Sequence, residues 1–116
     1  MQRDARAFLQ DIREACEAVE SHVRDMSFPA YVSDRKTRAA VEREFIIIGE
    51  AVTQLDRQAP QLVQRITDYR RVVDFRNQLT HGYFVIRNEI VWNIIQVDLP
   101  LLRQQMDQLL KELDTQ

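Results

Sequence analysis

Only five residues in this chain readily interrupt or sharply turn a helix, and they lie far apart. They are Pro29, Gly49, Pro60, Gly82 and Pro100. Both residue types are well below their usual abundance, so the backbone has few places to reverse direction. The simplest fold for such a chain is a handful of long helices. Its 116 residues suffice for one domain, residues 1–116, but not for two.

Apolar residues recur every three or four positions between these breaks, which is the spacing of one helix face. No segment has a credible strand pattern. The pattern predicts an all-α bundle of four or five helices with short connections. The expected helices cover 3–26, 35–58, 67–81, a segment from 88 and a segment from 98.

Capping residues and breakers suggest where these helices begin and end. We expect Pro29 to interrupt the chain between the first two helices, because it disfavours a helical conformation at Phe28. Gly82 is the natural stop of the third helix. The expected N-caps, in chain order, are Ser33 or Asp34, Thr67, Asn88 and Asp98.

The second expected helix is apolar on more than one side, because Ile46 and Ile47 lie beside the stripe that runs from Val41 to Leu55. The surplus predicts contact with both its own core and another subunit. Gly49 in its middle costs about 1 kcal/mol relative to alanine. A close approach of another helix would offset that cost.

Composition excludes several classes of protein. The net charge of −2 gives the whole molecule no field that attracts nucleic acid. A single cysteine, Cys16, cannot form an internal disulfide, and its place in an apolar stripe indicates a core residue. His22 is expected on the surface. No targeting segment, membrane span or metal-ligand spacing is visible, so we expect a cytoplasmic protein without a metal site.

Residues 76–84, RNQLTHGYF, gather the side chains best suited to chemistry. Asn77 and His81 are four residues apart and therefore neighbours on one helix face. Arg76 lies about 140° around and about 7.5 Å along the helix from His81, but its long side chain can curl toward the helix end. The expected helix end leaves Tyr83 outside and exposed.

These residue types suit RNA cleavage. Histidine transfers protons near neutral pH, and arginine stabilises charge that develops on a phosphoryl oxygen. Together they could cleave RNA through attack of its own 2′-OH, without a metal. One histidine cannot easily serve as both acid and base, but a two-fold dimer would supply a second.

The charge around the motif supports contact with phosphate. Between Arg65 and Arg87 five arginines face two aspartates, a local balance of +3. Arg70, Arg71 and Arg87 are the candidate RNA-binding residues, because guanidinium groups bind phosphate in a bidentate manner. A solvated basic helix face is the competing interpretation.

A purely structural interpretation of the motif also stands. The polar residues would only cap the end of a helix. Arg76 would be an ion-pair partner of Asp74 or Glu50, and Tyr83 would be an aromatic residue at an interface. Two roles are open for Glu50: orienting Arg76 across the helix pair, or facing solvent.

The stretch at 76–83 matches the R-x4-H-x-Y motif of the HEPN superfamily and resembles its HepT-type toxin branch in particular. The I-G-E-A segment at 48–51 is similar to part of that family's second helix. The V-W pair at 91–92 and the L-P pair at 99–100 resemble its downstream landmarks. The resemblance therefore spans residues 48–100, in order and at the family's spacing.

The resemblance implies an all-helical HEPN-type domain that forms a homodimer, with two motifs facing one cleft. It implies a metal-independent RNA endonuclease that needs no cofactor, with Arg76 and His81 catalytic and Asn77 supporting them. It also implies a type VII toxin–antitoxin module, in which an MntA nucleotidyltransferase antitoxin uses ATP to add AMP to the motif tyrosine, here Tyr83. That phosphate would repel RNA at the cleft mouth.

The chain departs from the family pattern at two positions. Tyr69 stands where the family often has tryptophan, which should matter little. Asp74 stands where glycine is frequent and could temper the charge of the arginine-bearing helix. Two other functions stay open: a non-catalytic helical binding partner of a minimal nucleotidyltransferase, and a purely structural dimer.

Overall fold

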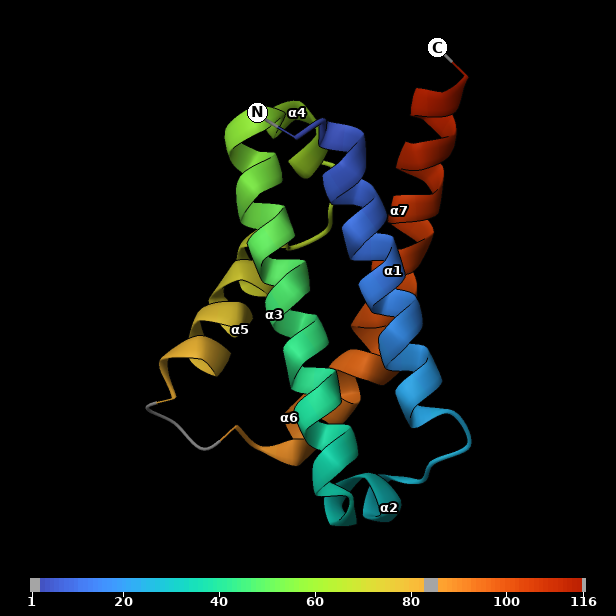
Figure 1. Cartoon of the computed structure of the whole chain (residues 1–116), viewed down its shortest axis with the longest axis vertical. Helices are drawn as coiled ribbons and strands as arrows, with labels where there is room; N and C mark the ends of the chain where they lie inside the picture. Colours follow the sequence, from blue (N-terminus) through green and yellow to red (C-terminus); the bar gives the residue numbers. More distant parts are fainter. Residues whose placement is uncertain (1–2, 83–85, 116) are drawn as a thin grey trace.

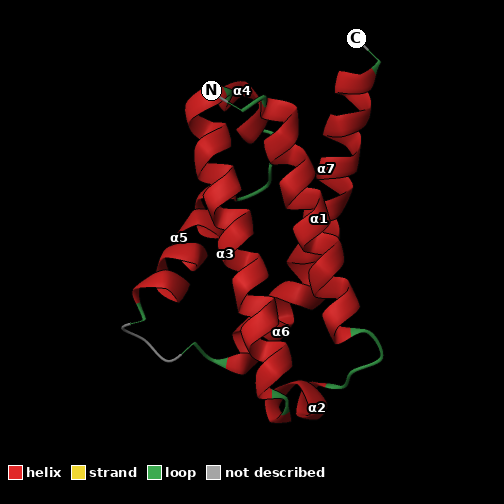
Figure 2. Cartoon of the chain, viewed as in Figure 1, coloured by secondary structure: helices red, strands yellow, loops and turns green. Residues whose placement is uncertain are grey.

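The computed structural model describes residues 3–82 and 86–115, and this part of the chain is helical and contains no strand (Figures 1 and 2). The all-α prediction is therefore confirmed. The elements are α1 Ala5–Val23, α2 Phe28–Ser33, α3 Arg35–Gln58, α4 Pro60–Val63, α5 Tyr69–His81, α6 Asn88–Asn93, the π-helical turn η1 Ile94–Asp98 and α7 Leu99–Asp114.

Helices α1, α3 and α7 form the main bundle, with α1 packed against both of the others (Figure 1). The predicted apolar stripes are the sides that they bury. Burying one such side chain fully stabilises the fold by about 1.5–3 kcal/mol. The buried residues include Ile12, Cys16 and Val19 of α1, Val41, Val52 and Leu55 of α3, and Met106 and Leu109 of α7.

The junction between the first two long helices is partly as predicted. Asp34 caps α3: its carboxylate accepts hydrogen bonds from the backbone N–H of Thr37 at 3.0 Å and from its hydroxyl at 2.8 Å. The expectation that Pro29 keeps this segment out of a helix was wrong. Pro29 lies in the first turn of α2, where no backbone N–H is needed, and Ser27 caps that turn.

Two other capping predictions were wrong. Thr67 does not cap α5, because its hydroxyl and backbone N–H bond to the side-chain amide of Gln105 on α7 at 2.8 and 3.3 Å. Asp68 takes the N-cap position in a left-handed conformation, with φ of 53°. Asn88 is the first residue of α6 and not its cap. Gly82 ends α5 with φ of 66°, as predicted.

Pro100 lies in the first turn of α7, as the sequence predicts, and Asp98 takes the N-cap position. From α6 to α7 the chain stays helical, and Asp98 has helical angles and makes no capping bond. Proline lacks the N–H of a regular helix, so the hydrogen-bond ladder must change near it. The change is a π turn in which the N–H of Leu99 bonds to the carbonyl of Ile94. The chain bends here, so α6 lies below α7 and at an angle to it (Figure 1).

Helix α5 lies outside the main bundle and packs against α3 (Figure 1). None of its residues is fully buried. A Cβ atom at Gly49 would lie 2.2 Å from Cβ of Arg76, so only glycine allows the two helices to approach this closely. The predicted close approach at Gly49 is thus confirmed, and it positions the motif arginine.

Candidate active site

The motif residues lie on two adjoining sides of α5. Arg76 faces α3 at Gly49. Asn77 and His81 lie one turn apart on the outer side, where they continue a ridge that starts at Arg70. We call Arg70, Asp74, Asn77 and His81 the outer ridge of α5; their spacing of four, three and four places them on one helix face.

Groups from two helices hold the Arg76 guanidinium. One terminal nitrogen donates to Asn77 Oδ1 at 2.8 Å, and the other lies 3.7 Å from Glu50 Oε1 on α3. Nε is buried and lacks a hydrogen-bond partner in the described structure. A buried donor without a partner costs roughly 1–3 kcal/mol, and among the described residues Nε of Arg38 is buried without a partner in the same way.

Glu50 lies beside Arg76 and is itself exposed to solvent, so it has a feature of both roles left open by the sequence. The ion pair is long and partly exposed, so it contributes about 1 kcal/mol or less to stability. Asp74, the other candidate partner, is exposed, and the described residues show no ion pair between it and Arg76.

His81 is the last residue of α5 and is exposed to solvent. The hydroxyl of Thr80 donates to the carbonyls of Arg76 and Asn77, at 3.1 and 3.3 Å, and satisfies part of the helix end. The side-chain oxygen of Asn77 accepts a hydrogen bond from Arg76 and does not cap the helix end.

The predictions for Tyr83 lie outside the described residues. The three RNA-binding candidates differ in position. Arg70 belongs to the outer ridge, with its guanidinium 5.6 Å from the ring centre of Tyr69. Arg71 points to another side of α5, and Arg87 is paired with Glu89. Arg70 thus shares a helix face with Asn77 and His81.

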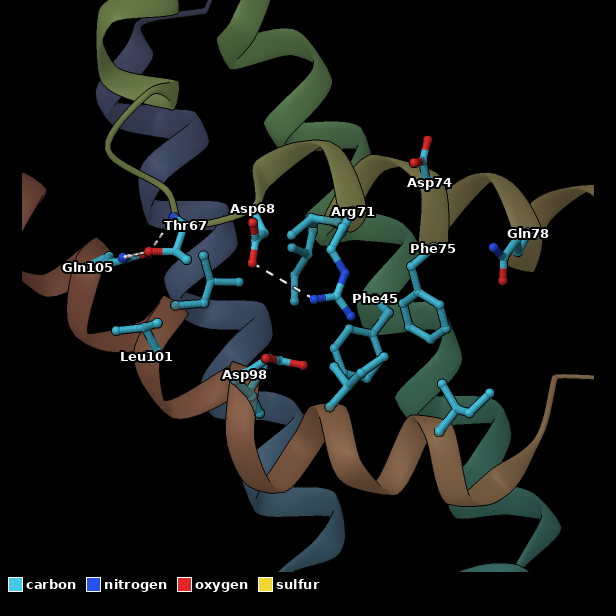
Figure 3. Close-up of a pocket in the computed structure, with 16 residues that line it drawn as sticks. Phe45, Thr67, Asp68, Arg71, Asp74, Phe75, Gln78, Asp98, Leu101 and Gln105 are labelled. Carbon is cyan, nitrogen blue, oxygen red and sulfur yellow. Dashed lines mark hydrogen bonds and ion pairs between the residues drawn. The ribbon is translucent and has the colours of Figure 1, made fainter.

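A hollow of about 410 Å³ lies between α5 and the α6–α7 segment (Figure 3). Phe45 and Phe75, which pack edge to face, and Arg71 are among the residues that line it. Two of its lining residues are large apolar side chains left open to solvent, Ile90 at 49% and Leu101 at 43% exposed. The sequence pattern did not reveal this hollow, because it treated Ile90 as part of an apolar helix face.

The remaining predictions concern a metal site, a membrane span, Cys16 and His22. In the ranges that the structure describes, no three His, Cys, Asp or Glu residues are grouped to hold a metal ion. Nor is any described helix long and apolar enough to cross a bilayer. Cys16 is buried, and burial raises the pKa of its thiol to about 12. His22 is exposed, as predicted.

Comparison with known proteins gives a consistent family. A family model described as Ribonuclease HepT-like matches residues 12–109. A probable ribonuclease HepT of Thermococcus cleftensis is 32% identical over 111 residues, covering 96% of this chain and all of the relative. A putative RNase of Methanocaldococcus jannaschii is 31% identical, covering 97% and 92%. One of Caldanaerobacter subterraneus is 29% identical, covering 92% and 95%. No solved structure matches the chain significantly.

Proposed function

This chain belongs to the Ribonuclease HepT-like family, and from that premise we propose that it is a metal-independent endoribonuclease of HEPN type. The observation that carries the proposal is the placement of Arg76. Its guanidinium is held by Asn77 and Glu50 beside the outer ridge that ends in His81. A fixed cation and an exposed imidazole on the same helix supply a group that stabilises negative charge and a group that transfers a proton.

In the proposed reaction, the 2′-oxygen of RNA attacks the adjacent phosphorus. A bond forms between O2′ and phosphorus as the bond from phosphorus to O5′ breaks. Histidine removes the proton from the 2′-OH or supplies one to the leaving O5′. Arg76 offsets the negative charge that builds up on the non-bridging oxygens. The products are a 2′,3′-cyclic phosphate and a free 5′-OH.

We propose that a homodimer supplies the second proton-transfer group. Removal and delivery of a proton in one step need two groups, so His81 of each copy would take one role. The exposed apolar side chains of the hollow support this, because Asp74 belongs to both the outer ridge and the hollow's lining. A second copy that covers the hollow would bring its own ridge close to the first.

We further propose that a cognate MntA-type nucleotidyltransferase neutralises the protein, as in a type VII toxin–antitoxin module. The tyrosine oxygen of Tyr83 would attack the α-phosphorus of ATP and release pyrophosphate. Tyr83 follows His81 by two residues, so the added phosphate would lie within reach of the motif. Its negative charge would oppose RNA at that point. Mass increases of whole AMP units on Tyr83 after co-expression would support this step.

The decisive experiment compares two histidine variants. Purified wild-type protein should cleave RNA in EDTA, and His81→Ala should abolish cleavage with an unchanged helical circular dichroism spectrum. His22→Ala removes an exposed histidine on α1 and is the matched control, which should retain full activity. Cleavage that survives in His81→Ala would refute the catalytic assignment.

A non-catalytic partner of a nucleotidyltransferase is the second candidate. It is favoured by the net charge of −2, since strong RNA binders are usually basic. In that case expression of this protein without the nucleotidyltransferase is harmless, and His81→Ala behaves like the wild type. Toxicity that is lost in His81→Ala excludes it.

A further inference from the structure

The solvent side of α3 carries a regular row of charged residues, of which the proposed reaction uses only Glu50, the ion-pair partner of Arg76. Lys36, Arg43, Glu50 and Arg57 follow one another at intervals of seven residues, and all four are exposed. Seven residues correspond to a rise of about 10.5 Å along a helix. The side chains drift by only about 20° at each step, so the row is nearly straight.

The row contains three cations and one carboxylate, and a fourth cation from α5 lies beside that carboxylate. Within the described ranges, Lys36, Arg43 and Arg57 form no ion pair. Glu50 is the one anionic member, and the Arg76 guanidinium stands beside it at 3.7 Å. A cation is therefore present at each of the four levels of the row.

The carboxylate nearest the start of the row does not cancel its charge. Asp34 lies close enough to Lys36 for the lysine charge to lower the pKa of the carboxyl group, but hydrogen bonds from Thr37 are the larger cause. Both Asp34 oxygens accept from Thr37. The lysine ammonium is left without a direct ion pair.

On the opposite side of the bundle, arginines form ion pairs with carboxylates. On α1 and α7, which lie side by side away from α5 (Figure 1), arginines are matched with carboxylates across the helix pair. A net charge of −2 therefore hides an uneven distribution. The matched pairs are Arg6 with Asp114, Arg13 with Asp107, and Arg103 with Glu20.

We propose that the three cations of this row, Lys36, Arg43 and Arg57, form a track together with Arg76 of α5. The track binds the phosphodiester backbone of single-stranded RNA. Regularly spaced cations, of which Lys36, Arg43 and Arg57 form no ion pair in the described structure, suit a ligand with regularly spaced negative charges. A single strand can adapt its backbone to the spacing of about 10.5 Å. The track rests on the proposed function, since Arg76 links it to the reacting phosphate.

The test measures RNA binding separately from cleavage. In a His81→Ala background, a labelled single-stranded RNA of about 16 nucleotides is titrated by fluorescence anisotropy at several salt concentrations. Each lost phosphate contact should lower the slope of log K against log salt by about 0.7. The Lys36→Ala/Arg43→Ala protein should therefore show a slope smaller by about 1.4.

Two double variants serve as controls. One loses two positive charges, as the test variant does, but elsewhere, and the other keeps its net charge. Arg24→Ala/Lys111→Ala removes two exposed cations that lie outside α3 and form no ion pair in the described structure. It should leave the slope at the level of the His81→Ala protein. Lys36→Arg/Arg43→Lys keeps both charges and should also leave it there. Thermal unfolding verifies that every variant is folded.

The outcomes separate the track from the reaction. An unchanged slope in Lys36→Ala/Arg43→Ala, an equal loss in the control pair, or no detectable RNA binding by any of the proteins overturns the track. If the wild type cleaves RNA while the slope is unchanged, the proposed function stands and the track falls. If nothing is cleaved but the slope decreases only in the α3 variant, the track stands without the reaction.

Discussion

Replacement of Gly49 by alanine adds one methyl group at the closest approach of α3 and α5. The new Cβ would lie 2.2 Å from Cβ and 2.6 Å from Cγ of Arg76. Carbon atoms pack at about 3.5 Å or more, so the shorter contact falls roughly 1.3 Å short. Rotation of the Arg76 side chain can move Cγ but not Cβ, because Cβ is attached to the backbone. The α5 backbone must therefore shift.

Two effects of opposite sign set the stability of this variant. Alanine improves helix propensity over glycine by about 1 kcal/mol, whereas overpacking of this kind costs about 1–3 kcal/mol. We expect Gly49→Ala to lower the free energy of unfolding by about 1 kcal/mol. For a domain of this size the melting temperature should decrease by about 4 °C.

The effect on cleavage should exceed the effect on stability. A displacement of about 1 Å in a catalytic group can reduce the rate about 100-fold, and here the shift moves the Arg76 guanidinium relative to Glu50. Denaturant unfolding and RNA cleavage by the same preparation measure the two effects. Ala39→Gly on the exposed side of α3 is the control, which should lose about 1 kcal/mol and keep its activity.

The opposite result would refute this reasoning. If Gly49→Ala is more stable than the wild type by about 1 kcal/mol and cleaves RNA at the wild-type rate, helix propensity decides and the close approach does not position Arg76.

Three further predictions concern single side chains. Glu50→Gln should leave the free energy of unfolding within about 1 kcal/mol of the wild type. It should slow cleavage, because a neutral amide no longer attracts the Arg76 guanidinium, which is then held by Asn77 alone. Denaturant unfolding and RNA cleavage assays measure the two effects. Two hydrogen bonds of 2.6 Å from Arg65 help to lower the pKa of Glu112 from 4.5 to about 2, so their stabilisation is complete above pH 4.5 and is lost as the pH falls toward 2. Glu112→Gln should flatten the dependence of melting temperature on pH in that interval. The thiol of Cys16, with its pKa raised to about 12, should resist alkylation at pH 8 in the folded protein and react after denaturation, as followed by mass spectrometry.

Helix periodicity is the part of the fold that the sequence determined by itself. The bounds predicted for α3, 35–58, are those of the structure, because a capping carboxylate and an apolar stripe are local signals. The same local geometry places Asn77 and His81 one turn apart and ends their helix at Gly82. A helix repeats every 3.6 residues whatever surrounds it, so these relations need no knowledge of other helices.

Tertiary contacts decided the rest. Thr67 is a good cap in isolation, yet a glutamine 38 residues away on α7 takes its hydrogen bonds. Proline usually breaks a helix, yet the chain continues from α6 into α7 at Pro100. A π turn, in which the Leu99 N–H bonds to the Ile94 carbonyl, accommodates the N–H that proline lacks. Which side of α5 meets α3 depends on the space that Gly49 leaves for Arg76, a distance between two helices that no spacing within one of them encodes.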